Sequence, residues 1–173
     1  MLKLSSFIKC YTNILSDDLC DQIITLDIDN FSPARSVVAN ARKCLTKKLD
    51  NKFDKDIYAV VGQILIKYKN DFEDFHTGLN TEDTGYEHLL YLGSEKGEYK
   101  EHTDHSDLFP RVLSCSLILN DNYKGGDFSF FNGEYVVKKK KGSVVVFPSN
   151  FCFPHAVTPV SKGNRHSIIT WIH

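Results

Sequence analysis

The residues best suited to chemistry are a histidine and an aspartate one residue apart, followed much later by a second histidine. They are His102, Asp104 and His155. Two imidazoles and one carboxylate can occupy one face of an octahedral metal ion and leave three positions open, the donor set typical of non-haem iron(II) centres. Arg165 follows on a later strand and could hold a carboxylate through two hydrogen bonds inside the same cavity.

None of these residues is decisive alone. A second H-x-D triplet, His105-Ser106-Asp107, lies beside the first, and either triplet could be an ordinary polar loop. A lone histidine near an apolar strand is usually a hydrogen-bonded core residue, and Arg165 near a hairpin end could be a solvated cation. Ser167, however, would face the same side of a strand as Arg165. Two donors that converge on one place suit a buried carboxylate.

The elements that must position these groups begin with an expected edge strand from Phe7 to Leu15. Ser16 is a plausible N-cap, and acidic residues follow it in the first turn of a helix over about 17–27. The next segment, residues 31–50, admits two interpretations. Val37-Val38 fits a strand, whereas Ala41 to Leu49 fits a short basic helix.

A longer helix is predicted next, because apolar residues recur at steps of three and four: Ile57, Val60, Val61, Ile64, Leu65, Tyr68, Phe72 and Phe75. From Tyr86 onward, turn residues separate short strands, which are expected at Glu87–Leu92, Gly97–His102, Val112–Leu119, Asp127–Phe131, Glu134–Lys138, Ser143–Phe147 and His166–Ile172. Helices followed by many strands predict an α+β fold with a double-stranded β-helix (jelly-roll) core and N-terminal helices packed on one sheet. We expect a single domain over 1–173, with helical support over 1–80 and the jelly-roll core over 81–173.

Composition narrows the partners and the compartment. The formal net charge is -1, so no global attraction to nucleic acid or to an anionic membrane is expected. Polar residues interrupt the first fifteen positions, and no apolar stretch is long enough for a membrane span, so neither a signal peptide nor a membrane anchor is expected. The five cysteines lack C-x-x-C spacing, which disfavours disulfides and structural zinc and favours a cytoplasmic location.

Several motifs after residue 86 agree in order and spacing with one known family. They are Tyr91, Gly97-Glu98-Tyr99-Lys100-Glu101-His102-Thr103-Asp104, Gly125-Gly126-Asp127-Phe128, Lys141-Gly142-Ser143-Val144-Val145-Val146-Phe147-Pro148, His155-Ala156-Val157-Thr158-Pro159-Val160, Gly163-Asn164-Arg165 and Trp171. This part of the chain resembles the 2-oxoglutarate/Fe(II) dioxygenases of the prolyl 4-hydroxylase type.

The resemblance implies a role for each candidate residue. His102, Asp104 and His155 would bind Fe(2+), since the family's tyrosine three residues before its first ligand matches Tyr99. His105 and Asp107 would then lie at the mouth of the site or behind the ligands. Arg165 and Ser167 would hold the distal carboxylate of 2-oxoglutarate, and Tyr91 would hydrogen-bond to that cosubstrate. Dioxygen is the other cosubstrate, and ascorbate would serve as reductant.

The resemblance also implies a reaction, the hydroxylation of a C–H bond, with a prolyl residue of a peptide or protein as the first expectation. Two features bear on the substrate. Ile118 stands where relatives that modify prolines of signalling proteins often carry tyrosine. Trp171 stands where nucleobase-repair relatives carry a second arginine, which counts against a nucleic acid partner.

Two alternative functions stay open. The same chemistry could act on a free amino acid, another small molecule or a nucleobase. The chain could instead be a metal-free jelly-roll binding module, although the complete ligand set and Arg165 count against that reading. The basic run Lys138–Lys141 is either a solvated hairpin arm or a grip for an acidic partner, and the oligomeric state is left open.

Overall fold

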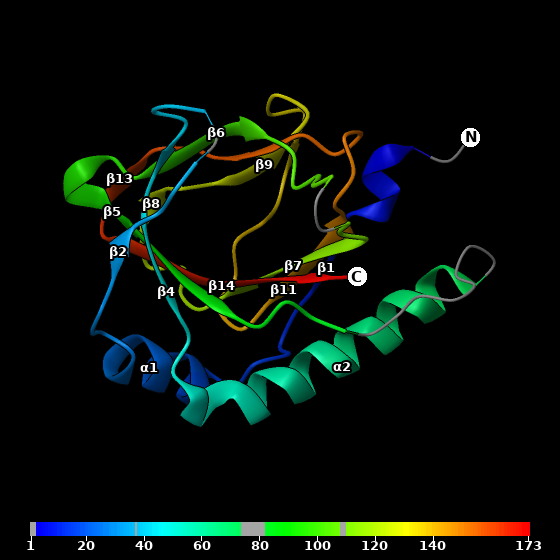
Figure 1. The fold of residues 1–173 in the computed structure, drawn as a ribbon, viewed down its shortest axis with the longest axis horizontal. Helices are drawn as coiled ribbons and strands as arrows, with labels where there is room; N and C mark the ends of the chain where they lie inside the picture. Colours follow the sequence, from blue (N-terminus) through cyan, green and yellow to red (C-terminus); the bar gives the residue numbers. More distant parts are fainter. Residues whose placement is uncertain (1–2, 37, 74–81, 108–109) are drawn as a thin grey trace.

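Two antiparallel β-sheets face each other, and two helices cover the outer face of the larger sheet (Figure 1). The computed structural model describes residues 3–36, 38–73, 82–107 and 110–173. This is the predicted α+β jelly roll with its helices on one sheet, and that prediction is confirmed. Within the described residues, no helix combines the length and the apolar character that crossing a bilayer requires.

The larger sheet has seven strands, in the spatial order β1 (Lys9–Tyr11), β11 (Val144–Pro148), β7 (Leu113–Ile118), β14 (Asn164–Ile172), β5 (Glu87–Leu92), β4 (Leu45–Lys48) and β2 (Ser32–Pro33). The smaller sheet has five, in the order β10 (Tyr135–Val136), β9 (Phe128–Phe130), β12 (His155–Val157), β6 (Glu98–His102) and β3 (Arg42–Lys43). A short pair joins β13 (Val160–Lys162) to β8 (Lys124–Gly125). Short 3-10 helices occur at η1 (Leu4–Phe7), η2 (Asn51–Phe53) and η4 (Gly93–Glu95).

Both predicted helices are present, and both pack on the larger sheet. Helix α1 (Asp17–Leu26) begins where Ser16 Oγ accepts a hydrogen bond from the backbone N–H of Leu19 at 3.1 Å. Helix α2 (Asp54–Asp71) buries the apolar face that the periodicity predicted; the last member of that series, Phe75, lies outside the described residues. These faces meet buried residues of β7, β11 and β14 in one core. A second core fills the space between the two sheets.

The predicted edge strand from Phe7 to Leu15 is largely wrong. The chain forms the helical turn η1 up to Phe7, and only Lys9–Tyr11 pairs with β11. Asn13 then takes a left-handed conformation with φ 58°, which ends the extended run. Beyond it, the backbone N–H groups of Ile14 and Leu15 both donate to the carbonyl of Gly142.

Of the interpretations left open for residues 31–50, the short basic helix from Ala41 to Leu49 is wrong, because this segment forms β3 and β4. Strand β3 pairs with β6 on the smaller sheet, and β4 pairs with β5 on the larger sheet. The edges of β5 and β6 offer backbone partners that a helix would leave unused, so tertiary pairing overrides the weak local preference. Val37 of the alternative strand lies outside the described residues. Residues before 80 thus supply strands as well as helices. The division into helical support over 1–80 and jelly-roll core over 81–173 stays a prediction.

A chain of buried polar groups ties the end of α1 to the larger sheet. Asp27 is 1% exposed and accepts contacts from Lys47 Nζ at 2.6 Å and from His88 Nδ1 at 2.8 Å. The other ring nitrogen of His88 lies 3.1 Å from His166 Nδ1. With His88 Nδ1 donating to the carboxylate, its Nε2 accepts from His166, so the chain is satisfied when both rings are neutral.

Replacing His166 with asparagine is expected to make the protein less sensitive to acid. Burial, followed by the charges of His88 and Arg165, lowers the pKa of His166 from 6.5 to about 4. Between these values the unfolded chain binds a proton that the folded chain does not, so stability falls as the pH falls. For each pH unit in this window, the free energy of unfolding of the variant should fall by up to about 1.4 kcal/mol less than that of the wild type. Urea unfolding at several pH values measures this, with His173→Asn as the control. An unchanged pH dependence would contradict it.

Candidate functional site

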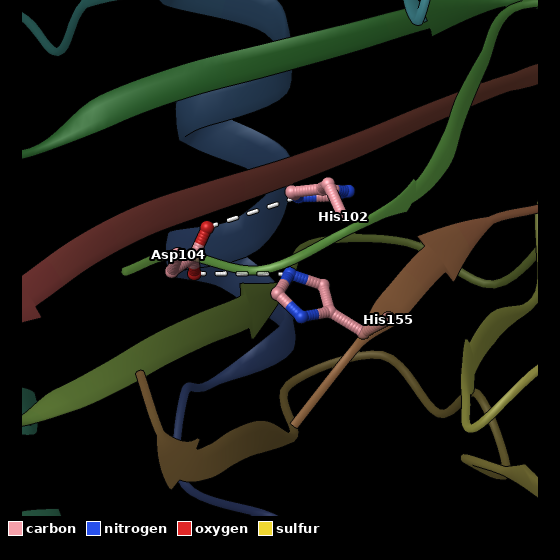
Figure 2. Close-up of side chains that lie close together, drawn as sticks. All are labelled: His102, Asp104 and His155. Carbon is pink, nitrogen blue, oxygen red and sulfur yellow. Dashed lines mark ion pairs between the residues drawn. The ribbon is translucent and has the colours of Figure 1, made fainter. Parts of the chain in front are cut away.

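The three predicted metal ligands come together at one end of the smaller sheet. His102 ends β6, Asp104 follows it, and His155 opens β12, where it is the register partner of His102. One nitrogen or oxygen atom from each residue lies within 4.8 Å of the others. Figure 2 shows both imidazoles directed at the Asp104 carboxylate, with the Nε2 atoms of His102 and His155 each 3.7 Å from one of its oxygens.

Backbone carbonyls fix the orientation of both rings. His102 Nδ1 lies 2.8 Å from the carbonyl oxygen of Lys100, and His155 Nδ1 lies 3.0 Å from that of Phe153. Each Nδ1 therefore carries the proton, and each Nε2 presents a lone pair to the space beside Asp104. The 3.7 Å separations are too long for hydrogen bonds, so the three donors are aimed at a common space and not paired with one another.

The protonation states suit metal binding. Burial, reinforced by the charge of His155, lowers the pKa of His102 to about 4, so this ring is neutral at neutral pH. Burial opposes ionisation of Asp104, but the charge of His155 and the hydrogen bond from Ser114 hold the pKa of this carboxyl below its usual value. A neutral imidazole and an ionised carboxylate are the forms that donate electron pairs to a cation. The donor set thus fits an iron(II) ion.

Two buried serines hold the carboxylate from behind. Ser114 Oγ donates to Asp104 Oδ2 at 2.7 Å and lies 2.8 Å from Ser149 Oγ. Both hydroxyls are buried, with Ser114 on β7 of the larger sheet. This contact fixes which oxygen of Asp104 faces the histidines.

Replacing Ser114 with alanine is expected to weaken Fe(II) binding by about 10- to 100-fold, because the carboxylate loses the group that orients it. The measurement is anaerobic titration of the purified protein with Fe(II). Ser143→Ala is the control, since Ser143 is equally buried but its hydroxyl has no hydrogen-bond partner among the described residues. Equal Fe(II) affinities in the two variants would remove Ser114 from this role.

A cavity of about 570 Å³ opens between the sheets beside the three ligands. Arg165 and Ser167 reach it from β14, and Tyr91 reaches it from β5, where it is the register partner of Arg165. The Arg165 guanidinium is 5.0 Å from the centre of the Tyr91 ring, and its Nη1 donates to Ser167 Oγ at 2.8 Å. The predicted carboxylate-binding residues are therefore assembled in one cavity with the predicted metal ligands.

Arg165 is a buried cation that the protein does not neutralise. Its side chain is only 3% exposed, yet within the described part of the chain no carboxylate lies within 4.0 Å of it. A buried charge is costly unless an opposite charge accompanies it. The position therefore fits the distal carboxylate of a dicarboxylic acid, and 2-oxoglutarate is such an acid.

The sequence did not point to Tyr123, which interacts with Arg165 from the segment after β7. Ile118 is buried next to Ser167 in the register of β7 and β14 and shares a core cluster with Tyr123. The phenol of Tyr123 thus reaches Arg165 from the segment after β7, although β7 itself ends in the apolar residue Ile118. No periodicity marks such a contact, because the two residues lie far apart along the chain.

Three further cavity residues were not assigned a role: Arg42, Arg111 and Trp171. The Arg111 guanidinium stacks 3.7 Å from the Trp171 ring centre, and Nη1 of this arginine donates to the backbone carbonyl of Asp104 at 3.3 Å. Arg42 comes from the segment whose secondary structure the sequence left open. The basic residues of this segment are spaced without a pattern that would distinguish Arg42, which lines the cavity, from its exposed neighbours.

The remaining predicted residues are not part of the ligand cluster, although His105 lines the cavity beside it. His105 and Asp107 pair with each other at 2.9 Å, and Asp107 is almost fully exposed. Of the basic run Lys138–Lys141, Lys139 contacts Asp127 at 3.4 Å and Lys141 contacts Asp21 at 2.6 Å. These two lysines bind the protein's own carboxylates, as expected for a surface arm.

Comparison with known proteins agrees with this geometry. Residues 86–173 match the family model of the 2OG-Fe(II) oxygenase superfamily. Two curated relatives are PKHD-type hydroxylases. The one from Alteromonas mediterranea is 34% identical over 91 residues, 46% of this chain and 39% of the relative. The one from Rippkaea orientalis is 33% identical over 94 residues, 49% of this chain and 41% of the relative. The matched segment thus spans about two fifths of each relative.

Solved structures show the same fold at low sequence identity. A prolyl-4-hydroxylase from Pseudomonas putida has a TM-score of 0.76 at 22% identity, with 96% of this chain and 92% of that chain covered. A prolyl hydroxylase from Trichoplax adhaerens, in complex with a peptide fragment of a hypoxia-inducible factor, has a TM-score of 0.76 at 19% identity, with 97% and 84% covered. From the family match over the core that carries the ligands, the chain belongs to the 2OG-Fe(II) oxygenase superfamily.

Proposed function

We propose that this protein is an Fe(II)- and 2-oxoglutarate-dependent dioxygenase that hydroxylates a prolyl residue in a peptide or protein. The observation that carries the proposal is the unneutralised Arg165 in the same cavity as a convergent set of two histidines and one carboxylate. One group fits a dicarboxylate cosubstrate, and the other fits the metal ion. Neither group alone would distinguish this chemistry from a structural role.

The metal ligands in this proposal are Nε2 of His102, a carboxylate oxygen of Asp104 and Nε2 of His155. When bound, the iron would couple the oxidative decarboxylation of 2-oxoglutarate to succinate with insertion of an oxygen atom into a C–H bond. The protein holds both imidazoles in the required tautomer through the carbonyls of Lys100 and Phe153. Ser114 holds the carboxylate, so the three donors need little rearrangement to accept the ion.

Arg165 would bind the distal carboxylate of 2-oxoglutarate, assisted by the Ser167 hydroxyl. Tyr91 and Tyr123 flank the guanidinium and restrict its movement, so its position is set before the cosubstrate arrives. The surrounding wall is apolar at Leu89 and Ile169, which limits water around the ion pair. A dry, oriented pocket of this kind strengthens the attraction between the arginine and the carboxylate.

Support for a prolyl substrate comes from the relatives. The curated proteins are named hydroxylases, and several proteins of the same fold are named prolyl hydroxylases, one of them solved with a peptide. We further propose a cytoplasmic location, supported by five cysteines that are all free in the structure.

The test is succinate formation from 2-oxoglutarate by anaerobically purified protein supplied with Fe(II), ascorbate and oxygen. Capped prolyl peptides, free L-proline and single-stranded oligonucleotides are compared as substrates. Succinate formation that peptides stimulate, with a product heavier by one oxygen atom, is the expected result. Stimulation by free L-proline or by the oligonucleotide alone would replace the peptide proposal with the corresponding alternative.

A further inference from the structure

The cavity contains more positive charge than the metal and cosubstrate can use. Four arginines line it, Arg35, Arg42, Arg111 and Arg165, whereas the acidic lining residues are Glu87 and Asp104. Across the described residues, no ion pair within 4.0 Å joins any of these arginines to a carboxylate. In the proposed loaded site, the charges of the divalent ion, Asp104, Arg165 and the dianionic cosubstrate cancel. The charged lining residues that remain are three arginines, Arg35, Arg42 and Arg111, and one glutamate, Glu87.

Arg42 is the best placed of these three to bind a ligand. Its Nε donates to Cys44 Sγ at 3.1 Å, and its guanidinium lies 4.8 Å from the centre of the Tyr99 ring. Neither neighbour is a carboxylate, so the positive charge of Arg42 has no counterion within 4.0 Å among the described residues. No acceptor among the described residues contacts the two terminal nitrogens of Arg42. A guanidinium held through Nε and stacked on an aromatic ring keeps those nitrogens free as a fork for a carboxylate.

Tyr99 also connects Arg42 to the metal site. Its ring stacks on the His102 imidazole with centres 3.4 Å apart and planes 15° apart. Arg42 and Tyr99 are register partners on β3 and β6, so the arginine is fixed to the wall that carries the first metal ligand. Arg165 stands on β14 of the facing sheet. A group bound at Arg42 would therefore lie near His102, on the wall of the smaller sheet.

The two arginines differ in ways that separate their ligands. Arg165 is nearly fully buried and is also held by Ser167 and Tyr123, as suits a cosubstrate that binds deep in the cavity. Arg42 is only partly buried, and exposed Arg35, from the segment after β2, lines the same cavity. A ligand that enters after the cosubstrate meets this outer wall.

We propose that Arg42 forms a second carboxylate-binding subsite, which selects substrates that carry a carboxylate close to the carbon to be hydroxylated. This inference rests on the proposed dioxygenase function, because it assigns Arg165 to the cosubstrate. The carboxylate is either an acidic side chain next to a prolyl residue or the free α-carboxylate of a terminal prolyl residue or free amino acid. The chemistry at Arg42 is the same in both cases.

The experiment measures substrate binding without turnover, by calorimetry under anaerobic conditions with Fe(II) and saturating 2-oxoglutarate. In one arm the probes are capped pentapeptides with glutamate, glutamine or lysine beside a central proline. In the other arm they are L-proline and L-prolinamide, together with a tripeptide that ends in proline with a free or an amidated terminus. In at least one arm, the carboxylate form should bind the wild-type protein about tenfold or more tightly than its neutral counterpart.

Arg42→Gln is expected to bring the carboxylate form down to the affinity of the neutral form while leaving 2-oxoglutarate binding unchanged. Lys43→Gln removes an exposed positive charge from the same strand and should keep the full preference. Arg42→Lys keeps the charge but loses the two parallel N–H donors of the guanidinium. Its preference for the carboxylate form over the neutral form should therefore be at least about threefold smaller than that of the wild type.

Three results would overturn the proposal: no preference for carboxylate in either arm, a full preference in both Arg42 variants, or loss of 2-oxoglutarate binding in Arg42→Gln. The binding test needs no oxygen and no reaction, so its outcome is independent of succinate formation. A carboxylate preference without any succinate formation would refute the oxygenase and leave the subsite standing.

Discussion

Replacing Asp104 with alanine is expected to lower the Fe(II) affinity more than about a hundredfold and to abolish succinate formation. Loss of a residue behind a metal ligand typically costs 10- to 100-fold in affinity, so loss of a ligand costs more. Asp104 is also the one anion of the proposed set, and without it two neutral imidazoles face a dication. The measurements are anaerobic Fe(II) titration and succinate formation under identical conditions.

The chain supplies a matched control for this prediction in its second triplet. Asp107→Ala removes a carboxylate three residues away that pairs with His105 and is almost fully exposed. It should leave Fe(II) affinity and succinate formation near the wild-type values, because surface changes of this kind have small effects. If Asp107→Ala lost the metal and Asp104→Ala kept it, the assignment of the two triplets would be reversed.

Local sequence patterns predicted the parts of the fold that local physics decides. Helix α2 follows from apolar residues at steps of three and four, and α1 follows from the Ser16 cap and the acidic residues after it. The H-x-D spacing marked His102 and Asp104 as candidate ligands, but the choice of this triplet over His105-Ser106-Asp107 rested on the resemblance to the family. Arg165 and Ser167 lie two apart on β14, so their common face follows from the strand period.

Edge strands and long-range contacts could not be predicted in this way. Strands β3 and β4 exist because β6 and β5 have edges that accept them, and the basic segment itself carries no strand signal. Asn13 ends β1 through a left-handed conformation that many asparagines do not adopt. The contacts of Arg42 with Tyr99 and of Tyr123 with Arg165 join residues far apart in the chain. Pairing of this kind depends on the assembled sheets.

The consequence for the site is that each wall contributes one part that the sequence identified and one that it did not. The wall of the smaller sheet carries the histidines and also Arg42 on β3. The wall of the larger sheet carries Arg165, and Tyr123 reaches it from the segment after β7. The unpredicted residues are those that would adjust affinity and selectivity, whereas the predicted residues define the chemistry.

Replacing Arg165 with glutamine is expected to weaken 2-oxoglutarate binding about thirtyfold or more. Removing one partner of a buried, hydrogen-bonded charge pair costs about 2–5 kcal/mol, and each 1.4 kcal/mol is a factor of ten. The affinity is measured by calorimetry with Fe(II) in the absence of oxygen. Lys162→Gln is the control, because it removes an exposed positive charge from β13 close in sequence and should leave the affinity unchanged.

The same variant is expected to be no less stable than the wild type when 2-oxoglutarate is absent. Arg165 has no carboxylate partner among the described residues, so the free protein bears the cost of an unneutralised buried cation, and glutamine removes that cost. Saturating 2-oxoglutarate should then raise the melting temperature of the wild type but not that of the variant. If Arg165→Gln instead destabilised the free protein while binding 2-oxoglutarate normally, the arginine would be a structural residue, and the cosubstrate's carboxylate would bind elsewhere in the cavity.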